Sequence, residues 1–182
     1  MKKIIAGDSG SFEKLVSRCQ NKIFAFVYRM VGSREDAGDL TQEVFFQVFR
    51  SLKSFRRDAK LDTWLYRIAA NKTLDFLRKN KKARFVNFDL DNYQDEASLT
   101  CLPENNPEQM FLQEEKMRTL RRMIAGLPDR YRLVLVLFHY QELSYKQIAE
   151  TLEIPVKTVA TRLYRAKFIL KETLRGDTDE MP

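Results

Sequence analysis

Apolar residues in the first part of the chain recur every three or four positions, which is the spacing of one face of an α-helix. Between positions 12 and 30 they are Phe12, Leu15, Val16, Cys19, Ile23, Phe26, Val27 and Met30. Gly32 follows this run and predicts its end, and Ser33 with Asp36 resembles a capping pair that opens the next helix. We therefore expect a first helix that places Cys19 in the core.

The same spacing continues along most of the chain and predicts further helices. They cover 36–52, 62–82, 108–125, 129–141, 144–152 and 155–174. Residues 83–107 show neither a helical nor a strand period and carry Asn, Asp, Ser and Pro, which is typical of a linker. The expected fold is all-α, with two small helical domains, 1–82 and 108–176, joined by a flexible acidic linker over 83–107 and followed by a tail over 177–182.

Composition narrows the class of protein. Of 182 residues, 44% are hydrophobic and 31% are charged, close to the averages of globular proteins. The two cysteines, Cys19 and Cys101, are too far apart to indicate a disulfide framework or a metal site. The longest apolar run, 133–138, is far shorter than the ~20 residues that span a bilayer. We expect a cytoplasmic protein with no metal, no cofactor and no membrane insertion.

Charge is divided into blocks along the chain. The net charge is +7, but residues 50–84 carry +9, residues 85–117 carry −7 and residues 118–175 carry +7. A single basic stretch is more often a solvated surface than a binding site. Two separated basic blocks, each on a helical pattern, favour a polyanion as the partner.

The predicted helix 36–52 has two different faces. Its inward face holds Leu40, Val44, Val48 and Leu52. The opposite arc, about 100° wide, holds Asp39, Gln42, Glu43, Phe46 and Arg50. An aromatic residue ringed by polar groups is typical of the centre of a protein interface, but a position covered by another part of the same domain fits the spacing of Phe46 equally well.

The predicted helix 62–82 carries aromatic, cationic and amide side chains on one arc. Its members are Trp64, Arg67, Asn71, Asp75 and Arg78. An indole can stack on an unpaired base, guanidinium groups can hold phosphates and an amide can read a base edge, so the arc suits single-stranded nucleic acid. The preceding loop adds cations at Arg56, Arg57 and Lys60. The alternative is a purely structural Trp64 that anchors the core.

The C-terminal part has the outline of a helix-turn-helix. Ser144 and Gln147 match a capping box, and residues 153–155 form a short connection whose proline is preset to start the next helix. That second helix turns Val159, Leu163, Ala166 and Leu170 inward. Its outer face offers Lys157, Thr158, Thr161, Arg162 and Arg165. Short hydroxyl residues and arginines on a recognition helix can reach base edges and phosphates in the major groove.

Four segments together resemble the bacterial extracytoplasmic-function sigma factors, the small class with only the second and fourth sigma regions. They are Asp-Leu-Thr-Gln-Glu-Val-Phe at 39–45, Thr-Trp-Leu-Tyr-Arg-Ile-Ala at 63–69 with Asn71 after it, Leu-Ser-Tyr-Lys-Gln-Ile-Ala at 143–149, and Pro-Val-Lys-Thr-Val at 155–159. The resemblance covers nearly the whole chain. It departs from the family at Ala160, where the family often has a lysine or arginine.

The resemblance implies a role for each face. The helix of 39–45 would dock on the clamp of the largest subunit of core RNA polymerase, and the flap would be a second contact. The helix of 63–69 would melt the promoter and read the minus-10 element, with Asn71 holding a base flipped from the non-template strand. The helix-turn-helix would read the minus-35 element, and an anti-sigma factor would be the regulator.

Two other classes of function fit less well. A two-domain helix-turn-helix regulator that does not form holoenzyme would share the C-terminal pattern, but it would need neither a single-strand stripe nor a polymerase-docking face. An enzyme is disfavoured because the only histidine, His139, lies in an apolar helix without a nearby catalytic constellation. Binding to core polymerase in the absence of DNA would separate the sigma factor from the regulator.

Overall fold

In a computed structural model, the structure describes residues 9–52, 55, 60–80 and 107–179. The secondary-structure elements longer than one turn in these ranges are all α-helices. They are α2 (Ser9–Val31), α3 (Arg34–Ser51), α4 (Leu61–Lys79), α5 (Pro107–Gly126), α6 (Asp129–His139), α7 (Tyr145–Leu152) and α8 (Val156–Asp179). The all-α prediction is confirmed. The predicted linker, apart from Pro107, lies outside the described residues.

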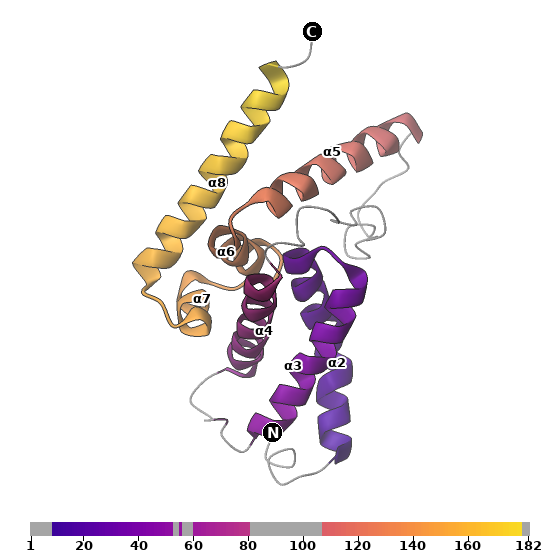
Figure 1. The fold of residues 1–182 in the computed structure, drawn as a ribbon, viewed down its shortest axis with the longest axis vertical. Coiled ribbons are helices and arrows are strands. Elements are labelled where there is room, and N and C mark those ends of the chain that lie inside the picture. Colours follow the sequence, from indigo (N-terminus) through magenta and orange to yellow (C-terminus); the bar gives the residue numbers. More distant parts are fainter. Residues whose placement is uncertain (1–8, 53–54, 56–59, 81–106, 180–182) are drawn as a thin grey trace.

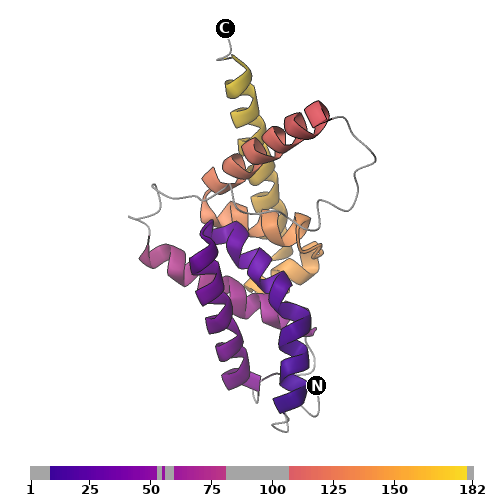
Figure 2. The same cartoon turned by 90° about the vertical axis from the view of Figure 1, so that its right-hand side faces the viewer.

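The N-terminal half is a bundle of α2, α3 and α4, which pack pairwise on one another. Figures 1 and 2 show α2 and α3 side by side, with α4 crossing them. The predicted inward face of α3 is buried as expected at Leu40, Val44, Val48 and Leu52. Burying a side chain of this size contributes roughly 1.5–3 kcal/mol. Cys19 is only half-buried at the edge of this core, and burial, together with the charge of Asp62, raises the pKa of its thiol.

The corner between α2 and α3 follows from three local residues. Gly32 has a φ of 82°, a conformation that favours glycine, and its N–H donates to Tyr28 O at 2.8 Å, which ends α2. The Ser33 hydroxyl then accepts a hydrogen bond from the Asp36 N–H at 3.2 Å and caps α3. The predicted stop and cap are both confirmed.

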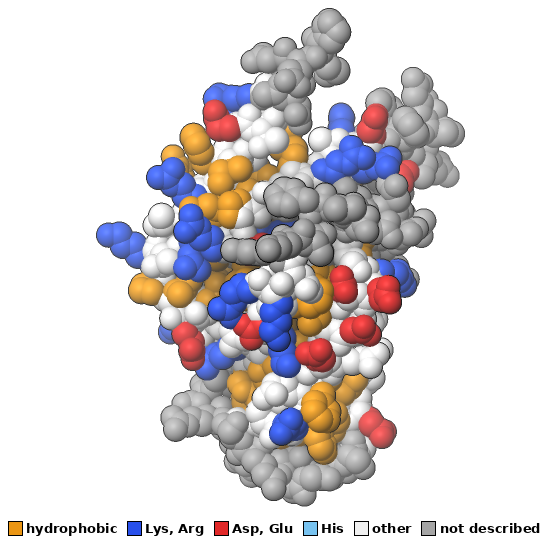
Figure 3. Space-filling view, in the orientation of Figure 1, with side chains coloured by type: hydrophobic (Ala, Val, Ile, Leu, Met, Phe, Trp, Pro, Cys, Tyr) orange, Lys and Arg blue, Asp and Glu red, His pale blue; other side chains and the backbone are white. Residues whose placement is uncertain are grey.

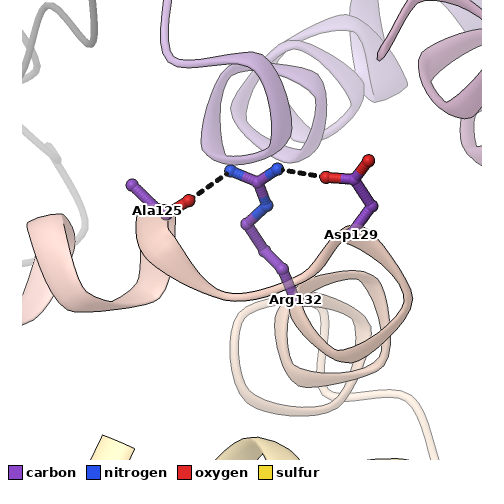
Figure 4. Close-up of polar contacts among 3 residues, drawn as sticks. All are labelled: Ala125, Asp129 and Arg132. Carbon is purple, nitrogen blue, oxygen red and sulfur yellow. Dashed lines mark hydrogen bonds and ion pairs between the residues drawn. The ribbon is translucent and has the colours of Figure 1, made fainter. Parts of the chain in front are cut away.

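The C-terminal half is built around α6, which contacts both α7 and α8. Figure 1 shows α5 and α8 extending away from the N-terminal half. The α5–α6 corner is held by Arg132, whose side chain is 0% exposed. Its guanidinium donates to the Ala125 carbonyl at 3.0 Å and to the Asp129 carboxylate at 2.7 Å (Figure 4). A buried cation is tolerated because these partners replace its water.

The two halves touch each other. Helix α2 packs on α6, and α4 packs on α7 (Figures 1 and 2). Buried apolar residues of both halves form one continuous cluster, from Leu15 in α2 to Ala166 in α8. The sequence left open whether the halves are packed or splayed, because such contacts join residues far apart in the chain. The structure has them packed.

Three helices end two or more residues away from the predicted position. Helix α4 ends at Lys79, before the predicted 82, and Asn80 is its cap. Helix α6 ends at His139, two residues early, because the chain turns through Glu142 with a φ of 54°. Helix α8 runs to Asp179, beyond the predicted 174.

Candidate functional site

The outward arc of α3 is exposed along its length. Its members Asp39, Gln42, Glu43, Phe46 and Arg50 are all exposed. Phe46 keeps 62% of its surface accessible, and the Arg50 guanidinium lies 5.6 Å from the centroid of its ring. Phe46 is therefore not covered by its own domain, which was the alternative from spacing. Figure 3 shows hydrophobic side chains at the C-terminal end of α3 and acidic ones along its N-terminal part.

Phe49 extends this surface and was missed from the sequence. It is 56% exposed, and its ring meets Phe12 of α2 edge-on at 5.2 Å between centroids. It lies just outside the predicted arc of α3, so helical spacing alone assigned it to neither face. Two exposed phenylalanines, three residues apart on one helix, make an apolar end to an otherwise polar face.

The α3 face and α4 are linked by an ion pair. Lys72 Nζ of α4 lies 3.1 Å from Glu43 Oε2 of α3, and both side chains are partly accessible to solvent. This pair joins two helices that carry different predicted faces. An exposed pair of this kind contributes about 0–1 kcal/mol.

The predicted single-strand arc of α4 is divided by the structure into an exposed part and a covered part. Asn71, Asp75 and Arg78 are exposed, and Asp75 pairs with Arg78 one turn away. Trp64 is partly buried against the core, and its ring lies 4.8 Å from that of Phe55. Part of the Trp64 side chain therefore packs against the core, as predicted by the alternative in which Trp64 is an anchor of the core. Lys60 is exposed at the start of α4, whereas Arg56 and Arg57 lie outside the described residues.

Arg67 is the member of the arc that contacts the other half of the chain. Its Nη2 donates to the Glu150 carbonyl oxygen at 2.9 Å, and its Nη1 lies 3.0 Å from Glu153 Oε1. Both partners belong to α7 and the turn after it, in the other half of the chain. The predicted DNA-binding arginine is thus held by the helix-turn-helix.

The helix-turn-helix has the predicted local geometry. Ser144 and Gln147 form a reciprocal capping box at the start of α7. Glu153 ends that helix in the left-handed region, with a φ of 54°. Val159, Leu163 and Ala166 of α8 are buried, and Leu170 is partly buried. The α7–α8 turn therefore presents the outer face of α8 to solvent.

The outer face of α8 lines one side of a shallow cleft of about 370 Å³. All five predicted residues, Lys157, Thr158, Thr161, Arg162 and Arg165, contribute to it. The other side is formed by Arg130 and Tyr131 from the first turn of α6, where the Arg130 guanidinium lies 4.7 Å from the Tyr131 ring centroid. Four cations therefore border this cleft, which suits an anionic backbone.

Sequence reasoning missed Arg130 and Tyr131. The adjacent basic and aromatic residues after Pro128 were a local signal. Nothing local, however, shows that the first turn of α6 lies beside a helix that begins more than twenty residues later, at Val156. Only the packing of α6 on α8 brings the two together.

His139 has no catalytic setting. Its ring meets Phe138 edge-on at 4.9 Å, and partial burial, together with the nearby charge of Lys167, lowers its pKa. Within the described ranges, no group of three or more His, Cys, Asp or Glu residues is placed to hold a metal ion. None of the helices in those ranges has the length and apolar character needed to cross a membrane.

Two family models match the chain, one in each half. Sigma-70 region 2 matches residues 15–83, and Sigma-70, region 4 matches residues 117–167. The first covers α3 and α4, and the second covers the helix-turn-helix. They therefore place the exposed faces described above within the matched regions.

Solved structures with the same fold include two complexes. One is CnrH in complex with the cytosolic domain of CnrY, with a TM-score of 0.68, 23% identity and coverage of 97% of this chain and 95% of that one. The other is the sigma factor RpoE in complex with the anti-sigma factor NepR from Bartonella quintana, with a TM-score of 0.66, 18% identity and coverage of 91% and 97%. At 23% and 18% identity, the similarity shows that these proteins share the fold of this chain.

Curated relatives are similar over nearly their whole length. The ECF RNA polymerase sigma factor SigW of Bacillus subtilis (strain 168) is 35% identical over 177 residues, which are 96% of this chain and 95% of the relative. The ECF RNA polymerase sigma-E factor of Escherichia coli (strain K12) is 34% identical over 171 residues, 92% of this chain and 88% of the relative. With both sigma regions in order and such relatives along its length, the chain belongs to the extracytoplasmic-function sigma factors of RNA polymerase.

Proposed function

We propose that this sigma factor performs its three tasks on three separate helical faces: α3 binds core RNA polymerase, α4 reads the melted minus-10 strand, and α8 reads the minus-35 duplex. The observation that carries the proposal is the exposure of all five arc residues of α3 on a chain that also presents a basic helix-turn-helix cleft. A DNA-binding regulator that does not form holoenzyme does not need an exposed docking face on α3.

The α3 face supports docking on a protein. Phe46 and Phe49 form an apolar end, and the rest of the face is polar, with the acidic residues Asp39 and Glu43 beside Gln42 and Arg50. An interface commonly has an aromatic anchor surrounded by polar groups that exclude water. The polymerase surface that fits is basic with an apolar pocket, and the clamp coiled coil of the largest subunit is the proposed partner.

The α4 face supports binding to unpaired DNA. Asn71 is exposed and can reach a flipped base, while the accessible part of the Trp64 indole offers a surface for stacking. Arg67 and Arg78 would hold phosphates, with Asp75 orienting Arg78 through their ion pair. Lys60, together with Arg56 and Arg57 of the preceding loop, would add to the attraction for the strand.

The α8 cleft supports binding to duplex DNA from two elements. Lys157, Arg162 and Arg165 lie on α8, and Arg130 faces them from α6. A phosphate backbone that follows the major groove would be held on both sides of the recognition helix. This arrangement adds Arg130 to the cations of the recognition helix.

We also infer that the protein works in the cytoplasm and that an anti-sigma factor regulates it. The support is a solved structure of the same fold, RpoE, which is bound to the anti-sigma factor NepR. A partner that covers the α3 face would compete with polymerase.

The test uses purified protein and core RNA polymerase without DNA. We expect a stable complex, followed by run-off transcripts from a subset of genomic fragments when DNA and nucleotides are added. A protein that binds duplex DNA but forms no complex with core polymerase would instead be a helix-turn-helix regulator, and the assignment of α3 would be wrong.

A further inference from the structure

Three cations form a row along the outer side of α2. Lys14, Arg18 and Lys22 follow one another at intervals of four residues, so their side chains lie within about 80° of one another around the helix axis. All three residues are exposed. At a rise of about 1.5 Å per residue, the row is roughly 12 Å long. We call these three residues the α2 stripe.

The charges of the α2 stripe are not neutralised by neighbouring carboxylates. In the part of the chain that the structure describes, no ion pair joins any of the three to an acidic residue. Glu13 is the only acidic residue of α2, and its side chain lies about 100° around the helix from that of Lys14. By contrast, Lys72 and Arg78 of α4 each pair with a carboxylate. A row of unpaired cations produces a local positive potential that attracts a polyanion.

The α2 stripe lies beside the N-terminal end of α4. Helix α2 packs on α4, and the surroundings of Cys19 show which parts of the two helices meet. The pKa of the Cys19 thiol is raised by burial and by the charge of Asp62 in the first turn of α4, and Arg18 and Lys22 act on it in the opposite direction. Two cations of the stripe are therefore close to the start of the helix that carries the predicted single-strand face.

The order of the chain indicates which part of a promoter would reach the α2 stripe. From the C-terminal end of α4 the chain continues to the helix-turn-helix, which the proposed function places upstream, on the minus-35 element. We therefore expect the C-terminal end of α4 at the upstream side of the minus-10 element and the N-terminal end at its downstream side. A non-template strand that continues downstream would leave α4 at the end where α2 presents its cations.

We propose that the α2 stripe binds phosphates of the non-template strand immediately downstream of the minus-10 element. This proposal rests on the proposed function of α4 as the reader of the melted strand and extends it to a second helix. At about 3.4 Å per stacked nucleotide, the stripe covers about four nucleotides. Because cations hold the backbone without reading base edges, the contact is independent of sequence. The alternative is a solvated surface, which is the more common fate of exposed cations.

The test compares the wild type with two variants of the full chain, each assembled with core polymerase. The stripe variant is Lys14→Gln with Arg18→Gln and Lys22→Gln. The matched control removes the same three charges from exposed positions of α5 and α8, as Lys116→Gln with Arg122→Gln and Lys171→Gln. Neither variant changes a residue of the α3 face, the α4 face or the α8 cleft. Circular dichroism checks that all three proteins are folded.

Two non-template oligonucleotides from a promoter found by run-off transcription serve as probes. The shorter ends with the minus-10 element, and the longer continues for about four nucleotides downstream. The stripe variant should bind the shorter like the wild type and the longer roughly tenfold more weakly than the wild type. For the longer, the slope of log affinity against log salt concentration should be smaller by about 2, at about 0.7 for each lost phosphate contact. The control should match the wild type on both.

Equal affinity of the stripe variant and the wild type for the longer oligonucleotide would overturn the proposal and leave the stripe as a solvated surface. An equal loss on both oligonucleotides would also overturn it, because the stripe would then not act beyond the minus-10 element. So would a loss of the same size in the control, which would indicate an effect of net charge alone. If the wild-type holoenzyme binds neither oligonucleotide, the proposed function of α4 fails, and the contact of α2 fails with it.

Discussion

Phe46 and Phe49 are the same type of residue on the same helix and are exposed to a similar extent, but their surroundings differ. Phe49 packs edge-on against Phe12, so part of its contribution is to hold α2 on α3. The ring of Phe46 is covered on one side by Arg50 and is otherwise accessible. Removing the two rings should therefore have different consequences.

We predict that Phe46→Ala weakens binding to core polymerase by about 2 kcal/mol, roughly thirtyfold, because a central aromatic anchor commonly costs this much to remove. Its melting temperature should stay at the wild-type value, since the described fold makes little use of the ring. Equilibrium binding to fluorescently labelled core polymerase and thermal unfolding would measure the two effects.

Phe49→Ala serves as the comparison. Loss of its contact with Phe12 should lower the free energy of unfolding by about 0.5–1.5 kcal/mol. If Phe46→Ala lowers stability as much as Phe49→Ala and leaves polymerase affinity unchanged, the ring is a packing residue and the docking face must be placed elsewhere.

At the scale of the helix, caps and helix ends that depend on residues within one turn of each other are predicted well from the sequence. The cap at Ser33, the stop at Gly32 and the capping box of Ser144 with Gln147 are all set by residues three or fewer positions apart. Helical spacing likewise identified the buried side of α3 and the outer side of α8.

The sequence does not predict contacts between distant elements. Arg67 and the carbonyl of Glu150 are 83 positions apart, and both types of residue are common on solvated surfaces. The pairing of Arg130 with the α8 cleft likewise depends on how α6 packs. The place of Arg130 among the cations of the α8 cleft is thus visible only in three dimensions.

One hydrogen bond on α8 bears on which part of Thr161 would contact a base. The Thr161 hydroxyl donates to the Lys157 carbonyl of its own helix at 2.9 Å. Its donor is therefore used within the helix, which leaves the methyl group and the hydroxyl lone pairs for a base, and we expect the methyl group to make the contact. A methyl group can contact the C5-methyl of thymine in the major groove.

We predict that Thr161→Val keeps the minus-35 base preference, because it keeps the methyl group and removes only the hydroxyl. Thr161→Ser, which keeps the hydroxyl and removes the methyl, should lose about 1–3 kcal/mol of discrimination at one position. Binding of holoenzyme to a set of single-base promoter variants measures both. The reverse order, with the preference lost only in the valine variant, would show that the hydroxyl reads the base.

At the scale of the whole molecule, charge and packing oppose each other. The basic blocks over 50–84 and 118–175 attract the same polyanion, and their mutual repulsion disfavours a packed arrangement. The continuous apolar cluster and the contacts of Arg67 with Glu150 and Glu153 hold the halves together in spite of it. DNA that neutralises both blocks removes this repulsion, so charge neutralisation by itself does not drive the halves apart.

Strand opening is the step of initiation that Asn71 can test. Its side chain is exposed on α4, so Asn71→Ala should leave the stability unchanged. An amide that captures a flipped base offsets the cost of unpairing the duplex, and a pre-melted bubble does not have that cost. We therefore predict a strong loss of transcription on duplex promoters and near-normal transcription on a template with a pre-melted bubble.

Asn80→Ala is the matched control, since Asn80 is also exposed but caps α4 on the side of the helix away from the arc. It should transcribe both templates like the wild type. An Asn71→Ala protein that is equally defective on duplex and bubble templates would show that the side chain supports binding to an already opened strand or to polymerase. The opening step would then have to be assigned to Trp64 and to the loop that precedes α4.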